Sequence, residues 1–75
     1  MAKVLINNTS FTMVLDGAGF CISDNEVKYA FGDTEPTDDD AFTLNPRSQV
    51  NSVYGKKLWA KSVNFESAYV TPIEE

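Results

Sequence analysis

The sequence predicts an all-β fold, a small antiparallel β-sandwich or barrel of six to eight short strands. Turn-forming residues recur roughly every 8–12 residues along the chain, a spacing typical of such folds. The segments between the turns are rich in Val, Ile, Phe, Tyr and Thr, which favour strands. No window of about 11 residues shows the 3.6-residue apolar period of an amphipathic helix. The 75 residues therefore form a single β domain, residues 1–75.

Alternation of side chains along the chain marks the best strand candidates. In Val27–Phe31 the first, third and fifth side chains share one face, opposite a lysine and an alanine. Phe11–Leu15 has the same alternation, which predicts one face for Phe11, Met13 and Leu15. In chain order, the candidate strands are residues 3–6, 11–15, 20–23, 27–31, 42–44, 49–53, 58–62 and 67–71.

Turn residues predict how these strands are connected. Asp16–Gly19 contains two glycines, and their tolerance of positive φ predicts a hairpin loop between the second and third strands. Gly32–Ala41 contains a proline and five acidic residues, which oppose a strand and predict a surface loop. The last strand is expected to end before Pro72, ahead of an acidic tail.

Composition and charge exclude several classes of function. The chain has 11 acidic and six basic residues, a net charge of −5, which argues against binding along a nucleic-acid backbone. It has no histidine and a single cysteine, so Ser-His catalysis, disulfides within the chain and the common zinc sites are ruled out. Its apolar runs are too short for a signal peptide or a membrane span. We therefore expect a soluble protein without enzymatic activity, cofactor or membrane partner.

The acidic loop and the cysteine are the remaining candidates for chemistry. The carboxylates of Asp33–Asp40 do not have the spacing of an EF-hand, and consecutive acids are more often solvated than metal-bound. Paired carboxylates can also hydrolyse sugars, but so short a β chain hardly supplies the necessary cleft. Cys21 lies in an apolar run without a neighbouring cation, so it is expected to be a small buried hydrophobe. No catalytic or metal site is predicted.

The aromatic residues are the candidate partner contacts. If Leu58 and Ala60 point into the core, then Trp59 and Lys61 point outward, and an outward tryptophan is typical of protein interfaces. The reverse orientation, with Trp59 inside and Leu58 outside, fits the pattern equally well. The predicted contact residues are Trp59, Tyr54, Leu58, Phe42 and Tyr69. A domain this small without disulfides or metals is commonly stabilised by association with itself or a larger assembly.

Two motifs resemble a known group of proteins. Val27–Leu44 reads VKYAFGDTEPTDDDAFTL, and Leu58–Ser62 reads LWAKS. Together they resemble small β-rich structural proteins of tailed-bacteriophage virions, in which a strand ending in an aromatic–alanine pair precedes an "EPT-D-DAF-L" loop and an "LWA(K/R)S" strand. The resemblance covers about residues 27–62. It implies that Pro36, Phe42, Leu44 and Trp59 are structural or interface positions, with no catalytic residue.

The resemblance implies a capsid decoration protein, a head fibre or a tail accessory protein. Its partners would be copies of itself, in a homo-oligomer such as a trimer, and the major capsid or tail protein. It would be made in the host cytoplasm and reside in the virion. Two alternatives stay open: a small acidic inhibitor that binds a host enzyme or mimics nucleic acid, and a tail-fibre-type module that binds host glycans through Trp59 and Tyr54.

Overall fold

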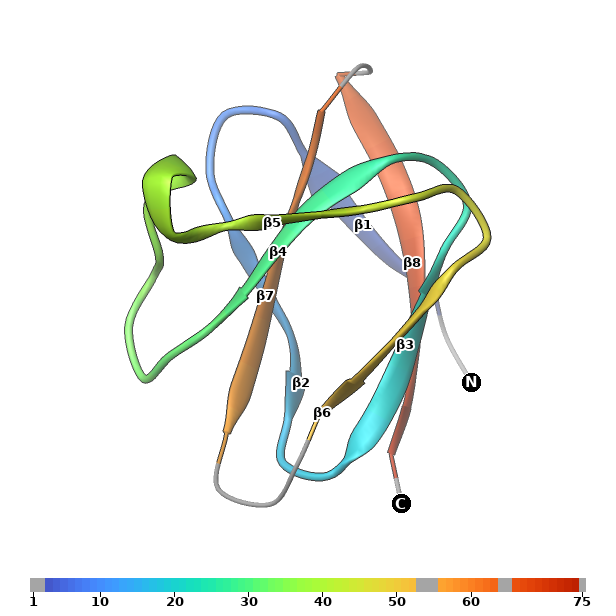
Figure 1. Ribbon diagram of the computed structural model, residues 1–75. Helices are drawn as coiled ribbons and strands as arrows, with labels where there is room; N and C mark the ends of the chain where they lie inside the picture. Colours follow the sequence, from blue (N-terminus) through green and yellow to red (C-terminus); the bar gives the residue numbers. More distant parts are fainter. Residues whose placement is uncertain (1–2, 53–55, 64–65, 75) are drawn as a thin grey trace.

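A computed structural model describes residues 3–52, 56–63 and 66–74 of the chain. These residues form eight strands and one turn of 3-10 helix (Figure 1). The strands are β1 (Val4–Asn7), β2 (Thr12–Asp16), β3 (Gly19–Ser23), β4 (Val27–Phe31), β5 (Phe42–Leu44), β6 (Gln49–Ser52), β7 (Lys57–Ser62) and β8 (Ser67–Glu74). The 3-10 turn, η1, spans Asp38–Asp40. Within the described ranges, no helix has the length and apolar character needed to cross a membrane.

The strands pair into two four-stranded antiparallel sheets, which confirms the predicted sandwich. Sheet A has the strand order β1-β8-β3-β6, and sheet B has the order β2-β7-β4-β5. Neighbouring strands in a sheet, such as β1 and β8, come from distant parts of the sequence (Figure 1). The fold is therefore held together by long-range pairing rather than by local hairpins.

The core between the sheets is aliphatic. Its buried side chains are Ile6, Val14, Leu15, Cys21, Val27, Leu44, Val50, Leu58, Ala60, Ala68 and Val70. Two stacked sheets lie about 10 Å apart, a gap that medium-sized side chains from both inner faces fill. Among the residues that the structure describes, no aromatic ring belongs to this buried cluster, and Tyr29 packs against it while partly buried. The aromatic residues that the structure describes therefore lie mainly at the periphery of the sandwich.

Asp16–Gly19 does not form the predicted hairpin, because β2 belongs to sheet B and β3 to sheet A. The two glycines do have the expected positive φ, 109° at Gly17 and 151° at Gly19. The Gly17 N–H donates to the Lys56 carbonyl at 2.7 Å, a bond that ties the connection to the start of β7. A tight hairpin and a crossover between sheets both need positive φ, so the glycines alone do not distinguish them.

An irregularity in β2 also differs from the predicted alternation. The pairing with β7 shifts between Met13 and Leu15, so that Val14 is an extra residue in the strand. Val14 and Leu15 are both buried, whereas Met13 is 43% exposed. The prediction that Met13 and Leu15 share a face is therefore wrong, because a bulge moves the following side chains to the other face.

The last strand is longer than predicted and includes Pro72. In β8, Pro72 lies opposite Cys21 of β3, and pairing continues to Glu74. The described ladder with β1 ends at the Val4–Val70 pair, so β8 has no β1 partner at Pro72. Proline is tolerated in a strand where one side is unpaired, because its missing N–H breaks no ladder bond.

Candidate interaction surfaces

The predicted contact residues occupy different environments. Leu58 and Ala60 are completely or almost completely buried, so the orientation that places Leu58 in the core is the one observed. Leu58 is therefore a core residue, and its prediction as a partner contact is wrong because none of its surface is accessible. Phe42 and Tyr69 are 63% and 48% exposed, and Trp59 is half-buried. Tyr54 lies outside the described residues.

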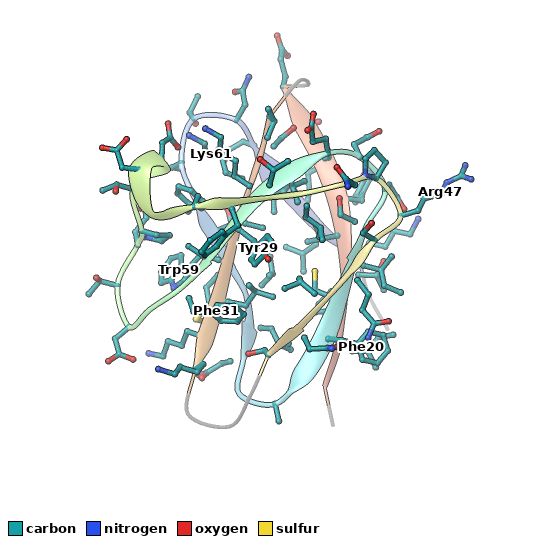
Figure 2. The ribbon with its side chains drawn as sticks, viewed as in Figure 1. Phe20, Tyr29, Phe31, Arg47, Trp59 and Lys61 are labelled. Atoms are coloured by element: carbon teal, nitrogen blue, oxygen red, sulfur yellow. The ribbon has the colours of Figure 1, made fainter. Side chains whose placement is uncertain are left out.

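Trp59 lies on the outer face of sheet B, where the acidic loop (residues 32–41) is fastened. Figure 2 shows Trp59 on the side of β4 and β7 opposite to Tyr29 and Phe31. Its indole Nε1–H donates to the Gly32 carbonyl at 2.9 Å, and the Gly32 N–H donates to the Lys57 carbonyl at 3.1 Å. Trp59 therefore holds the acidic loop in place and has no free donor for a ligand.

Two carboxylates of the acidic loop also bind the sheet. Glu35 Oε2 accepts a hydrogen bond of 3.4 Å from the Phe11 N–H, and Asp38 Oδ1 accepts one from Lys61 Nζ. The Lys61 ammonium also lies over the Phe11 ring, 5.2 Å from its centroid. Lys61 lies directly opposite Lys28 on β4, so Asp38 neutralises a site where two cations meet. The loop is therefore a folded cover, with Phe11 and Ala30 buried on this outer face, apart from the main core.

The environment of Asp38 explains its ionisation. The hydrogen bond from Lys61 lowers the pKa of the Asp38 carboxyl, and the charges of Lys61 and Lys28 act in the same direction. Among the described residues, no three acidic or cysteine side chains are grouped so that they could hold a metal ion. Glu35 and Asp38 thus face a backbone donor and a cation of their own chain.

Three aromatic rings form a partly exposed cluster on β4 and β5, here called the aromatic cluster. Tyr29 meets Phe31 edge-on, with ring centroids 6.1 Å apart and an interplanar angle of 82°. On its other side Tyr29 meets Phe42, at 5.8 Å and 37°. Phe42 is 63% and Phe31 39% exposed, and Figure 2 shows Tyr29 and Phe31 pointing to the same side of β4. Aromatic pairs in these geometries attract each other, so the cluster is a preorganised surface.

The exposure of the aromatic cluster follows from its place in the sandwich. Tyr29 is opposite Ala60, and Phe31 is opposite Leu58, so both rings belong to the inner face of sheet B. The two sheets contact each other chiefly through β1, β2, β3, β7 and β8. The inner face of β4 and of the edge strand β5 is consequently covered less completely than the rest, and its aromatic side chains reach solvent.

A second apolar surface lies on the outer face of sheet A. Leu5 of β1 is directly opposite Tyr69 of β8, and they are 56% and 48% exposed. On β3, Phe20 and Ile22 alternate with buried residues and point outward, as Figure 2 shows for Phe20. Lys3 reaches over the Tyr69 ring, 5.9 Å from its centroid, and pairs with Asp24 at 3.5 Å.

Several of these surface residues were absent from the sequence prediction. The prediction that Phe31 shares a face with Tyr29 and Val27 is correct. The sequence did not indicate that Phe31 is exposed on that face. Leu5 was part of a continuous apolar run, Val4–Ile6, in which nothing local distinguishes the inward from the outward side chains.

Cys21 is buried as expected, and desolvation raises the pKa of its thiol to about 11, so it stays protonated.

Comparison of the chain with protein-family models, with curated proteins and with solved structures finds no match.

Proposed function

We propose that this chain is a non-enzymatic structural protein of a tailed-bacteriophage virion, which binds a capsid or tail surface through protein–protein contacts. A decoration protein or a head-fibre protein is the simplest form of this role, with synthesis in the host cytoplasm and residence in the virion. The partners would be the major capsid or tail protein and further copies of the chain.

The aromatic cluster is the observation that carries this proposal. Tyr29, Phe31 and Phe42 all lie within residues 27–44, the part of the chain that resembles the phage proteins. Exposed, mutually packed aromatic rings are typical of the centre of protein interfaces, where a few residues supply most of the binding energy. We infer that Phe42, the most exposed of the three, inserts into the virion surface.

The two alternative functions have less support from the described residues. An acidic inhibitor would present the carboxylates of the acidic loop to a partner, but Glu35 and Asp38 bind Phe11 and Lys61 of the same chain. A glycan site built on Trp59 would need its indole donor, which the Gly32 carbonyl occupies. The aromatic cluster involves neither feature.

Incorporation into particles tests the proposal. A phage that encodes this chain is grown with the wild-type gene, with Phe42→Ala, or with Thr43→Ala, and purified particles are analysed by quantitative mass spectrometry. Thr43 is the matched control, because it is exposed on the same strand but points to the opposite face. Loss of an interface aromatic costs about 2 kcal/mol or more, so Phe42→Ala is expected to reduce incorporation about 30-fold at limiting protein.

The outcomes separate the role from the contact. Wild-type chain that is produced during infection but missing from the particles would overturn the virion role. Equal incorporation of the wild type and Phe42→Ala would keep that role and exclude the aromatic cluster as the docking surface. Circular dichroism of both variants establishes that they are folded.

A further inference from the structure

The strands of sheet A contain few charged residues, although the chain as a whole is well charged. Charged residues make up 23% of the sequence, and the net charge is −5. Among the strand residues of sheet A, which are 4–7, 19–23, 49–52 and 67–74, the one charged residue is Glu74, which ends β8 opposite Gly19. Sheet B, by contrast, contains Asp16, Lys28, Lys57 and Lys61 in its strands. The charge of the molecule is therefore distributed over sheet B, the loops and the chain ends.

The outward side chains of sheet A form an uncharged surface of apolar and polar residues. Three cross-strand rows contain its apolar side chains: Leu5 with Tyr69, then Thr71 with Ile22 and Gln49, and finally Ile73 with Phe20 and Asn51. Apolar or aromatic side chains occupy each row on β1, β8 or β3, and uncharged amides on β6 complete the last two. Lys3 and Asp24, the charged pair beside Tyr69, lie at the rim.

We propose that this outer face of sheet A binds a second copy of the chain across a twofold axis. Two molecules with a net charge of −5 repel each other unless they meet through a neutral surface, and the uncharged outward positions of sheet A supply one. Beside Tyr69 lie one cation and one anion, Lys3 and Asp24, with side chains 57% and 53% exposed, so Lys3 of each copy can pair with Asp24 of the other. A patch that holds one charge of each sign can pair with its own copy, as a twofold interface requires.

The dimensions of the molecule agree with such a dimer. The Cα atoms span 29 × 25 × 17 Å, and the thin direction of a two-sheet sandwich is the one across the sheets. The broad face therefore offers roughly 700 Å², close to the roughly 800 Å² that each partner buries in a stable interface of standard size. Burial of this face would also supply apolar contacts that a 75-residue domain lacks by itself.

The dimer deepens the proposed function. Its place in a virion rests on that function, whereas the dimer itself does not. A trimer needs two different patches that match each other around a ring, whereas one flat neutral face matches itself and produces a pair. The aromatic cluster lies on the inner face of sheet B and would stay accessible in the dimer. Each copy could then contact the virion with a surface that the dimer does not use.

Analytical ultracentrifugation of the purified chain tests the dimer without any phage particle. At micromolar concentration the wild type is expected to sediment as a species with twice the 8.3 kDa mass of one chain. Leu5→Lys and Tyr69→Lys each place an unpaired charge on the outer face of sheet A. Because both copies of a twofold dimer carry the substitution, each interface receives two such charges. We expect the dissociation constant of the dimer to rise by about a hundredfold or more in both variants.

Met13→Lys is the matched control, since Met13 is similarly exposed, at 43%, but lies on the outer face of sheet B. It is expected to sediment as the wild type does. A wild type that is monomeric at every concentration would overturn the dimer, and so would folded Leu5→Lys and Tyr69→Lys proteins that dimerise like the wild type. A monomeric wild type that still enters particles would refute the dimer alone and leave the virion role standing.

Discussion

Replacement of Leu58 by alanine is expected to destabilise the fold strongly without removing a contact to any partner. Leu58 has no exposed surface and lies on β7, an interior strand of sheet B. Its backbone neighbours across the sheet are Leu15 of β2 and Phe31 of β4. The strands on both sides hold these positions fixed, so the site cannot easily collapse around a smaller side chain.

The size of the effect follows from burial. A Leu→Ala change in a core generally lowers the free energy of unfolding by about 2–5 kcal/mol. Because Leu58 is completely buried on a central strand, we expect a loss of about 3–4 kcal/mol here. A chain of 75 residues has a free energy of unfolding of about 4–11 kcal/mol. The variant would therefore lose between about a quarter and nearly all of its stability.

Denaturant unfolding followed by tryptophan fluorescence measures this loss, because Trp59 is the only tryptophan of the chain. Met13→Ala is the control: Met13 lies opposite Trp59 but is 43% exposed, so its truncation is expected to cost less than about 1 kcal/mol. A loss below about 1 kcal/mol in Leu58→Ala would refute the central position of Leu58. Equal losses in the two variants would refute the assignment of inner and outer faces on β7.

Two further predictions concern polar groups. Lys61 lowers the pKa of the Asp38 carboxyl in the folded chain. The ionised carboxylate therefore stabilises the acidic loop fully at pH values above the ordinary pKa of an aspartate, and this stabilisation is lost as the pH falls through the lowered pKa. Asp38→Asn should therefore weaken the acid dependence of Trp59 fluorescence at low pH, and an unchanged acid titration would contradict the role of Asp38. Ser52 Oγ is buried without a hydrogen-bond partner, so Ser52→Ala is expected to leave stability unchanged or raise it by up to about 1 kcal/mol. Ser23→Ala, which removes a donor to the Asn25 carbonyl, should lower stability by about 1 kcal/mol. Thermal unfolding of the two serine variants checks both predictions. A Ser52→Ala protein that is less stable than Ser23→Ala would contradict them.

The local pattern of the sequence was sufficient for much of the fold. Val27–Phe31 and Phe42–Leu44 have the predicted bounds, and the acidic loop lies between them on the surface, with one 3-10 turn at Asp38–Asp40. Alternation and turn residues act within a few positions of each other, so they are visible without knowledge of the fold. The same pattern also predicted that Trp59 and Lys61 share a face.

The candidate surfaces required the tertiary structure. The sequence left open whether Leu58 or Trp59 is buried, because both alternating sets of β7 contain apolar side chains. Pairing of β7 with β2 and β4 decides it, and the acidic loop then covers Trp59 from a position 27 residues away. No local rule predicts this cover, since it depends on where a distant loop returns to the sheet.

By itself, the sequence determined the all-β class, most strand positions and the absence of histidine and of disulfides within the chain. Only the tertiary structure decided which strands are neighbours, that Asp16–Gly19 crosses between sheets, and that Leu5, Tyr69, Phe31 and Phe42 are exposed. The physical reason is the period of two in a strand. It encodes which side chains share a face, whereas the burial of that face depends on what the rest of the chain packs against it.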